Sequence, residues 1–159
     1  MRAVTLLDEL FSAFDELTAT HGLEKIRTIG DSYMAVAGAP DPRPDHAAAA
    51  VELATGILHA AAAWRGANDV TLQLRVGVAT GPVIAGVIGQ RRVLFDLWGD
   101  TVNTAARMES AGVPGRIQVA ASTWAVLRDR YRFVPRQLEV KGLGSMTTYL
   151  VEEDEIRAG

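Results

Sequence analysis

Stretches with helical periodicity alternate in this chain with pairs of short β-prone runs, and this order constrains the fold more than any other feature. Apolar residues recur at three- and four-residue spacing over Leu7–Leu17, which predicts an amphipathic helix that begins almost at the first residue. Two β-prone runs follow at 23–29 and 33–38, and the Gly30-Asp31 pair between them predicts a tight hairpin. Helices that alternate with hairpins are typical of an α+β fold with a mostly antiparallel sheet and helices packed on one face.

The alternation continues through the rest of the chain. A Pro-rich loop leads to Asp45, which is expected to cap a helix with a side of small apolar residues. Asp100 is expected to cap another helix, on which Asn103 and Arg107 share a face because they are four residues apart. The other expected elements are a hairpin of 72–78 with 83–88, a strand at 116–119, a short helix opened by Ser122, and strands at 132–140 and 146–151.

The composition limits the classes of function. At 159 residues and 48% hydrophobic content, the chain can bury one substantial core, so one globular domain is expected. The formal net charge of −3 gives no general attraction to nucleic acid or anionic lipid, so any phosphate-binding cations must be local. The absence of cysteine excludes disulfides, thiolate metal sites and a cysteine nucleophile, and a cytoplasmic location is the default. Uninterrupted apolar stretches are far shorter than the roughly 20 residues of a membrane helix, so no membrane contact is expected from this segment.

Several common nucleotide and hydrolase motifs are missing from the sequence. It has no phosphate-binding Gly-x-x-x-x-Gly-Lys-Ser/Thr loop, no dinucleotide-binding Gly-x-Gly-x-x-Gly after a strand, and no Ser-centred nucleophile elbow. What remains is a set of polar residues beside strand ends, hairpins and helix starts. These candidates are Lys25, Asp31, Asp96, Asn103, Arg107 and Lys141.

Four motifs, in order along the chain, carry a resemblance to a known family. The two long motifs are Glu24–Met34 and Phe95–Met108. The two short ones are Arg75–Gly77 with Thr80–Val83, and Val140–Gly144. With these motifs the chain resembles the catalytic domain of the class III adenylyl and guanylyl cyclases, in particular the bacterial homodimeric adenylyl cyclases.

The resemblance implies a ferredoxin-like α+β fold and a domain organisation. Residues 1–152 are expected to form the cyclase catalytic domain, and residues 153–159 a polar C-terminal tail. Members of the family begin with a strand of the type Phe-x-Asp-Ile/Val-x-Gly-Phe, which carries their first metal-binding aspartate. Nothing in this sequence matches that strand. We therefore expect that a preceding segment is absent, and that the chain taken literally is inactive or nearly so.

The resemblance assigns three residues to metal and purine binding. Asp31 matches the family's second metal-binding aspartate, although an aspartate in a hairpin turn needs no metal by itself. Lys25 and Asp96 match the pair that reads the purine, although each alone would be an ordinary solvated or capping residue. An ammonium donates to N1 of adenine and a carboxylate accepts from its amino group, whereas guanine inverts both contacts. The pair therefore favours ATP as the substrate.

Three further residues match the family's phosphate and ribose contacts. Asn103 is expected to hold the ribose, and Arg107 to neutralise the charge that builds on the α-phosphate in the transition state. Lys141 matches the lysine that binds the triphosphate. As an alternative, helices often carry an asparagine in the first turn and an exposed arginine, and a hairpin lysine is common, so these residues gain their meaning from the motifs around them.

The resemblance also implies a mechanism and an assembly. Two Mg²⁺ or Mn²⁺ ions per active site assist the attack of the ribose 3′-hydroxyl on the α-phosphate, and no covalent enzyme intermediate forms. In the family the metal aspartates come from one subunit and the other site residues from its partner. Because this chain has both sets, we expect a homodimer with its sites at the interface.

Three other functions are weighed against an adenylyl cyclase. A guanylyl cyclase should have an acidic residue in place of Lys25 and a small or thiol residue in place of Asp96, so the sequence disfavours it. A catalytically silent cyclase-like domain, which binds nucleotide or dimerises, is favoured by the missing first aspartate and disfavoured by Asp31, Asn103 and Arg107. A palm-type polymerase shares the architecture but would not need the asparagine and arginine on one helix.

Overall fold

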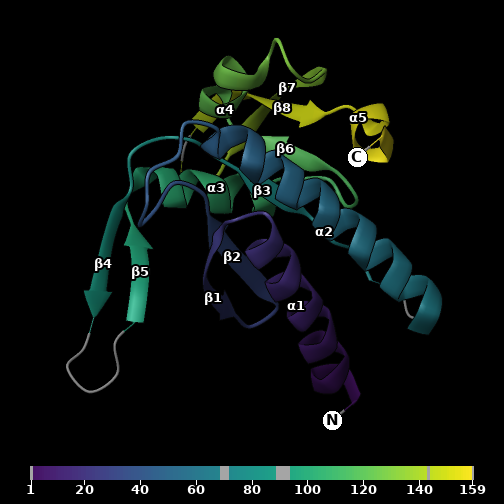
Figure 1. Cartoon of the computed structure of the whole chain (residues 1–159). Coiled ribbons are helices and arrows are strands. Elements are labelled where there is room, and N and C mark those ends of the chain that lie inside the picture. Colours follow the sequence, from purple (N-terminus) through teal and green to yellow (C-terminus); the bar gives the residue numbers. More distant parts are fainter. Residues whose placement is uncertain (1, 69–71, 89–93, 143, 159) are drawn as a thin grey trace. The chain divides into compact units, whose positions relative to one another are not determined.

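The computed structural model describes residues 2–68, 72–88, 94–142 and 144–158 (Figure 1). These residues divide into two compact units. Unit 1 consists of residues 1–72 and 85–96, and unit 2 of residues 73–84 and 97–159. Both units combine helices with mainly antiparallel strands, so the α+β fold predicted from the sequence is confirmed.

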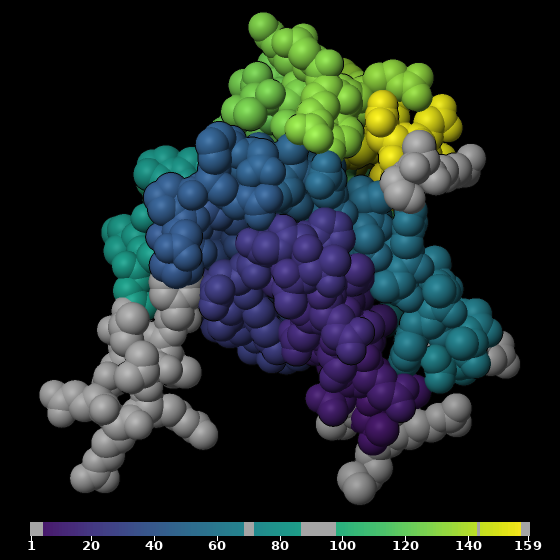
Figure 2. Space-filling model, viewed as in Figure 1, coloured from purple at the N-terminus to yellow at the C-terminus, as the bar shows by residue number. Residues whose placement is uncertain are grey.

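Unit 1 contains two helices and a hairpin, together with the segment 85–96. Helix α1 (Arg2–Thr20) packs on α2 (His46–Asn68), and strands β1 (Glu24–Ile29) and β2 (Ser32–Val36) follow α1 (Figures 1 and 2). The small side chains of α2 let its neighbours approach closely, and the apolar faces of both helices exclude water. The fully or almost fully buried residues of this core include Leu10, Phe14, Leu23, Ala49, Val51 and Leu53.

The β1–β2 hairpin has the turn that the sequence predicts. The strands are antiparallel, and Ile29 pairs with Ser32, which leaves Gly30 and Asp31 as the two turn residues. Gly30 has a φ of 58°, a value that a glycine adopts without steric cost. The register shifts between Lys25 and Arg27, so β1 carries a bulge directly beside Lys25.

Unit 2 contains a four-stranded sheet in the order β3-β6-β8-β7. Strand β3 (Val76–Val78) is parallel to β6 (Ile117–Val119), whereas β8 (Gly144–Val151) is antiparallel to both β6 and β7 (Phe133–Val140). Two of the three pairings are therefore antiparallel. Helices α3 (Asp100–Ser110) and α4 (Ala121–Leu127) contact this sheet, and the ring of Trp124 in α4 stacks on that of Tyr149 in β8 at 4.5 Å.

The predicted hairpin of 72–78 with 83–88 is wrong. Strand β4 (Ile84–Ile88) pairs with β5 (Leu94–Trp98) in a separate two-stranded sheet, while β3 pairs with β6. The segment between β3 and β4 bonds to the start of α4 instead of closing a hairpin. Thr80 N donates a hydrogen bond to Ser122 Oγ (3.3 Å), and Thr80 Oγ1 lies 2.8 Å from Thr123 Oγ1.

One predicted helix cap and one predicted helix start are also corrected. Helix α3 begins at Asp100 itself, and the capping position is held by Gly99, whose φ of 120° favours glycine. The Asp100 carboxylate lies in the first turn, where it complements the helix dipole without capping. Helix α4 has Ala120 at its capping position, and Ser122 instead accepts the bond from Thr80. Asp45 does precede α2 directly, and its carbonyl accepts from Ala49 N at 2.9 Å.

Helix α3 lies unusually close to β3 at Gly77. A β-carbon at this position would lie 2.5 Å from the Ala105 carbonyl oxygen and 2.8 Å from the Met108 carbonyl carbon, and it would also clash with Glu109 N. All three atoms belong to the helix backbone, which no side-chain rotation can move. Only glycine therefore permits this approach of helix to strand.

A buried polar network holds the end of α3 to the sheet. Gln118, opposite Gly77 in the β3–β6 ladder, is fully buried. Its amide nitrogen donates to Met108 O (2.9 Å), and its oxygen accepts from Arg136 Nη1 (2.6 Å) and Thr148 Oγ1 (2.9 Å). Arg136 Nη1 also donates to Ala111 O at 3.1 Å. A network of this kind fixes geometry because every member needs its partners.

Gln118→Leu is expected to lower the free energy of unfolding by about 2–3 kcal/mol, because it leaves buried donors and an acceptor without partners. Urea denaturation measures the loss. Gln137→Leu is the matched control, since Gln137 is exposed on β7, and it should change stability by less than about 0.5 kcal/mol. Equal effects of the two substitutions would contradict a special role for the buried network.

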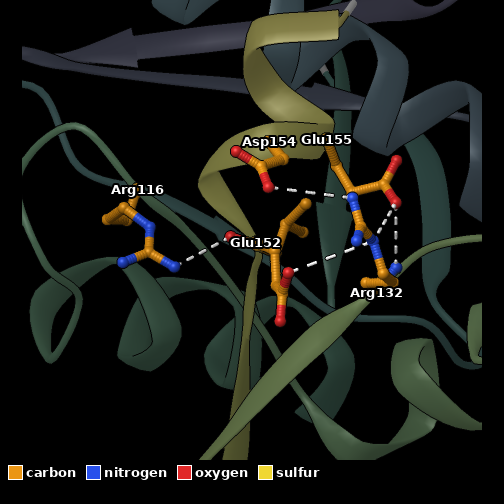
Figure 3. Close-up of polar contacts among 6 residues, drawn as sticks. Arg116, Arg132, Glu152, Asp154 and Glu155 are labelled. Carbon is orange, nitrogen blue, oxygen red and sulfur yellow. Dashed lines mark hydrogen bonds and ion pairs between the residues drawn. The ribbon is translucent and has the colours of Figure 1, made fainter.

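Residues predicted as a polar C-terminal tail form the short helix α5 (Glu153–Ala158). Figure 3 shows Arg132 among the acidic side chains that precede and begin this helix. Its Nε lies 3.3 Å from Glu155 Oε1, and Nη2 lies 3.9 Å from Asp154 Oδ2. Arg116 Nη1 lies 3.8 Å from Glu153 Oε1. The tail is thus tied to the unit by two arginines.

Among the described residues, α2 is the one helix long and apolar enough to cross a membrane by length and composition. Polar residues interrupt the apolar sequence of α2, so its continuous apolar runs are all shorter than a membrane helix. Half of the apolar window is buried inside the protein. A core helix has this property, and α2 supplies most of the buried residues of unit 1.

Candidate cyclase site

The six candidate residues are divided evenly between the two units. Unit 1 carries Lys25, Asp31 and Asp96, and unit 2 carries Asn103, Arg107 and Lys141. Each set is described within its own unit.

Lys25 is held by Asp15, an acidic residue that is not among the candidates predicted from the sequence. Its Nζ lies 3.1 Å from Asp15 Oδ1 and 3.3 Å from Oδ2, so the ammonium faces both carboxylate oxygens of a residue on α1. The same ammonium lies 5.4 Å from the centre of the Tyr33 ring, within the range of a cation–π contact. The lysine is partly exposed, with 38% of its side chain accessible.

Tyr33 links this pair to the core. Its hydroxyl donates to Asp15 Oδ1 at 2.7 Å, and its ring packs against Phe11 and Phe14 with centroid distances of 5.6 Å. Burial above all raises the pKa of Tyr33 well beyond its ordinary range, and the neighbouring Asp15 carboxylate adds to the shift. The phenol therefore stays protonated and remains a donor to Asp15.

Asp31 lies exposed at the tip of the β1–β2 hairpin. A carboxylate in this place is accessible to a hard cation. Among the residues that the structure describes, however, no group of three or more His, Cys, Asp or Glu side chains could hold a metal ion. Asp31 can supply one ligand, and the described side chains around it do not complete a metal site.

Asp96 lies at the centre of β5, a strand that is not among those predicted from the sequence. Its side chain lies outside the described part of the chain. The prediction that it contacts a purine therefore stays a prediction.

Helix α3 carries Asn103 and Arg107 one turn apart. Asn103 is exposed in the first turn, and its backbone N–H donates to Gly99 O at 3.2 Å. Arg107 is half-buried in the last turn. Their positions depend on how α3 docks, and Gly77 and Gln118 fix that docking through contacts with Ala105, Met108 and Glu109.

Arg107 lies against the turn that carries Lys141. A β-carbon on Gly142 would lie 3.6 Å from Arg107 Nη2 and 3.8 Å from Nε, so the guanidinium packs on the glycine directly after Lys141. Gly142 has a φ of 84°, which allows the turn between β7 and β8 to present its backbone to the arginine. The structure thus brings the arginine beside the lysine-bearing turn.

The sequence model of the adenylate and guanylate cyclase catalytic domain matches residues 1–153. The chain belongs to this family. Among relatives of this cyclase domain, an adenylate cyclase of Mycobacterium tuberculosis is 49% identical over 147 residues. The match covers 92% of the chain and 33% of the relative, so the chain spans about a third of the length of that protein.

Solved cyclase structures share the fold. The guanylate cyclase domain of RhGC from Catenaria anguillulae, in complex with GTP, is 38% identical with a TM-score of 0.87 over 94% of this chain and 83% of that one. The adenylyl cyclase CyaB from P. aeruginosa is 26% identical with a TM-score of 0.87 over 96% of this chain and 84% of that one. Both nucleotide specificities thus occur among the similar cyclases.

Proposed function

We propose that this chain is the catalytic domain of an adenylyl cyclase, which converts ATP to 3′,5′-cyclic AMP and pyrophosphate in intracellular signalling. One observation carries the choice of ATP: the chain has the adenine-type pair Lys25 and Asp96 within an overall 49% identity to an adenylate cyclase. The Asp15 contact supports it, because it holds the Lys25 side chain in place, and an ammonium can donate to N1 of adenine.

The chain's own residues account for the binding and electrostatic parts of the reaction. Asn103 would orient the ribose so that its 3′-oxygen faces the α-phosphorus. The 3′-hydroxyl loses its proton to solvent, the new O3′–P bond forms as the bond to the β-phosphate oxygen breaks, and pyrophosphate leaves. Negative charge builds on the phosphate oxygens in the transition state. Arg107, with its planar fork of donors, would stabilise that charge, and Lys141 on the adjoining turn would hold the departing pyrophosphate.

We further propose that each site uses two Mg²⁺ or Mn²⁺ ions, which would supply Lewis-acid stabilisation of the phosphates. Asp31 would be one ligand, and substrate phosphate oxygens would be others, as is usual for Mg²⁺. Because no group of three or more His, Cys, Asp or Glu side chains among the described residues could hold a metal ion, the proposed metal site requires protein ligands in addition to Asp31.

The active form is proposed to be a cytoplasmic homodimer with ATP bound at its interface. The chain contains both residue sets that the family divides between two subunits, so two copies of one chain could complete two equivalent sites.

A guanylyl cyclase is the second candidate, because a similar solved domain is described with GTP. Lys25→Glu separates the two. We expect it to lower kcat/KM for ATP more than about 100-fold, because N1 of adenine would then face an acceptor. Initial rates of cyclic nucleotide formation from ATP and from GTP measure the change.

Arg65→Glu is the matched charge-reversal control, on the exposed surface of α2, and it should leave the rates with both nucleotides unchanged. If Lys25→Glu lowered the rates with ATP and GTP equally, Lys25 would have no role in choosing the purine, and the assignment of ATP would lose its main support.

A further inference from the structure

The proposed purine-reading lysine is anchored by a network that lies entirely within unit 1. Lys25 comes from β1, Asp15 from α1 and Tyr33 from β2. The ammonium meets both oxygens of Asp15 at 3.1 and 3.3 Å, and the Tyr33 hydroxyl meets one of them at 2.7 Å. One carboxylate therefore accepts from both side chains.

Asp15 is itself held firmly in place. Tyr33 is packed between the rings of Phe11 and Phe14, and Phe14 is 1% exposed. The buried Thr18 hydroxyl lies 3.1 Å from Tyr33 Oη and 2.8 Å from the Phe14 carbonyl oxygen. The Tyr33 side chain that donates to Asp15 is thus held by packing against two phenylalanine rings and by a hydrogen bond with the Thr18 hydroxyl.

Lys25 would be poorly placed without such an anchor. Its side chain has four rotatable bonds, it is partly exposed, and it follows the start of β1 immediately before a bulge. A free lysine of this kind samples many rotamers, and a ligand that needs one of them must bear the ordering cost on binding. An ammonium has three donors, so one held by Asp15 still has a donor to offer to a purine nitrogen.

We propose that Asp15, supported by Tyr33, is a positioning residue that pre-orders the Lys25 ammonium for adenine and thereby contributes to the choice of ATP over GTP. This inference rests on the proposed adenylyl cyclase function. Asp15 contacts no substrate in this account; it acts through Lys25. Because both partners are partly exposed, at 38% and 45% of their side chains, the ion pair contributes little to folding, so variants can be compared in the folded protein.

Asp15→Asn and Asp15→Ala in the full-length protein test the proposal. We expect Asp15→Ala to raise KM for ATP about tenfold, to change kcat less than about threefold, and to lower the ATP-to-GTP ratio of kcat/KM by about the same tenfold factor. Asp15→Asn keeps one acceptor oxygen and should fall between Asp15→Ala and the wild type. Glu16→Gln, at an exposed position next along α1, is the control and should match the wild type.

A double-mutant cycle with Lys25→Ala distinguishes positioning from a general structural role. If Asp15 acts through Lys25, Asp15→Ala should have no further effect on KM for ATP once Lys25 is removed. An undiminished effect in the Lys25→Ala background, or a lower KM for ATP in the single variants, would overturn the proposal. An unchanged KM in the single variants would do the same. A wild-type protein that forms no cyclic nucleotide would instead overturn the adenylyl cyclase function itself.

Discussion

Arg107→Ala is expected to reduce kcat for cyclic AMP formation by about 100- to 1,000-fold, the usual cost of removing one donor that stabilises transition-state charge. The guanidinium packs on Gly142 beside Lys141, so its loss leaves the phosphate side of the site with a single nearby cation among the residues assigned to it. KM for ATP should change much less than kcat, because the interaction strengthens only as charge builds on the phosphate. Steady-state kinetics with ATP measure both parameters.

Two further variants show whether Arg107 acts through its charge or its shape. Arg107→Lys keeps the positive charge without the planar fork of donors, and we expect it to recover only part of the lost kcat. Arg128→Ala removes an exposed arginine that stacks over Trp124, and it should leave kcat unchanged. If Arg107→Ala kept kcat within threefold of the wild type, the arginine would have no catalytic role.

Gly77→Ala is expected to destabilise unit 2 by an amount at or above the upper end of the roughly 1–3 kcal/mol typical of overpacking. The added β-carbon would meet the Ala105 carbonyl oxygen at 2.5 Å and the Met108 carbonyl carbon at 2.8 Å, so α3 would have to move away from β3. Because α3 carries Asn103 and Arg107, the surviving folded protein should also lose activity. Urea denaturation and kcat measured together test both effects.

Gly66→Ala is the matched control for this substitution. Gly66 lies near the end of α2, and a β-carbon there would meet nothing within 4 Å. Alanine at this position should leave stability unchanged or raise it by up to about 1 kcal/mol, because alanine favours the helix. Similar losses of stability in the two variants would contradict the conclusion that Gly77 is required by the close approach of α3.

Local sequence signals predict the elements of this fold well where contacts join residues that are close together in the sequence. The β1–β2 hairpin follows from Gly30-Asp31, and the strands β7 and β8 follow from β-prone runs on either side of Gly142. The shared face of Asn103 and Arg107 follows from helical spacing alone. These features depend on residues a few positions apart.

The sequence alone did not predict the features that depend on contacts between residues far apart in the chain. Strand β3 pairs in parallel with β6, which lies about forty residues later in the chain. The periodicity of a strand's sequence does not identify its pairing partner. The anchoring of Lys25 by Asp15 joins a helix to a strand across an intervening turn, and an acidic residue on an amphipathic helix looks like any solvated one. Gln118 likewise appears polar in sequence, and only its burial reveals the network that it completes.

The most direct test of the central claim is cyclic nucleotide formation from ATP and from GTP in the presence of Mn²⁺, with the full-length protein and with residues 1–159 alone. The account predicts cyclic AMP from ATP with the full-length protein, at a rate at least about 100-fold above that of cyclic GMP from GTP. It also predicts little or no product from residues 1–159 alone, since no group of three or more His, Cys, Asp or Glu side chains in their described part could hold a metal ion. A full-length protein that dimerises and binds nucleotide but forms neither product would contradict the account and would identify a silent cyclase-like domain.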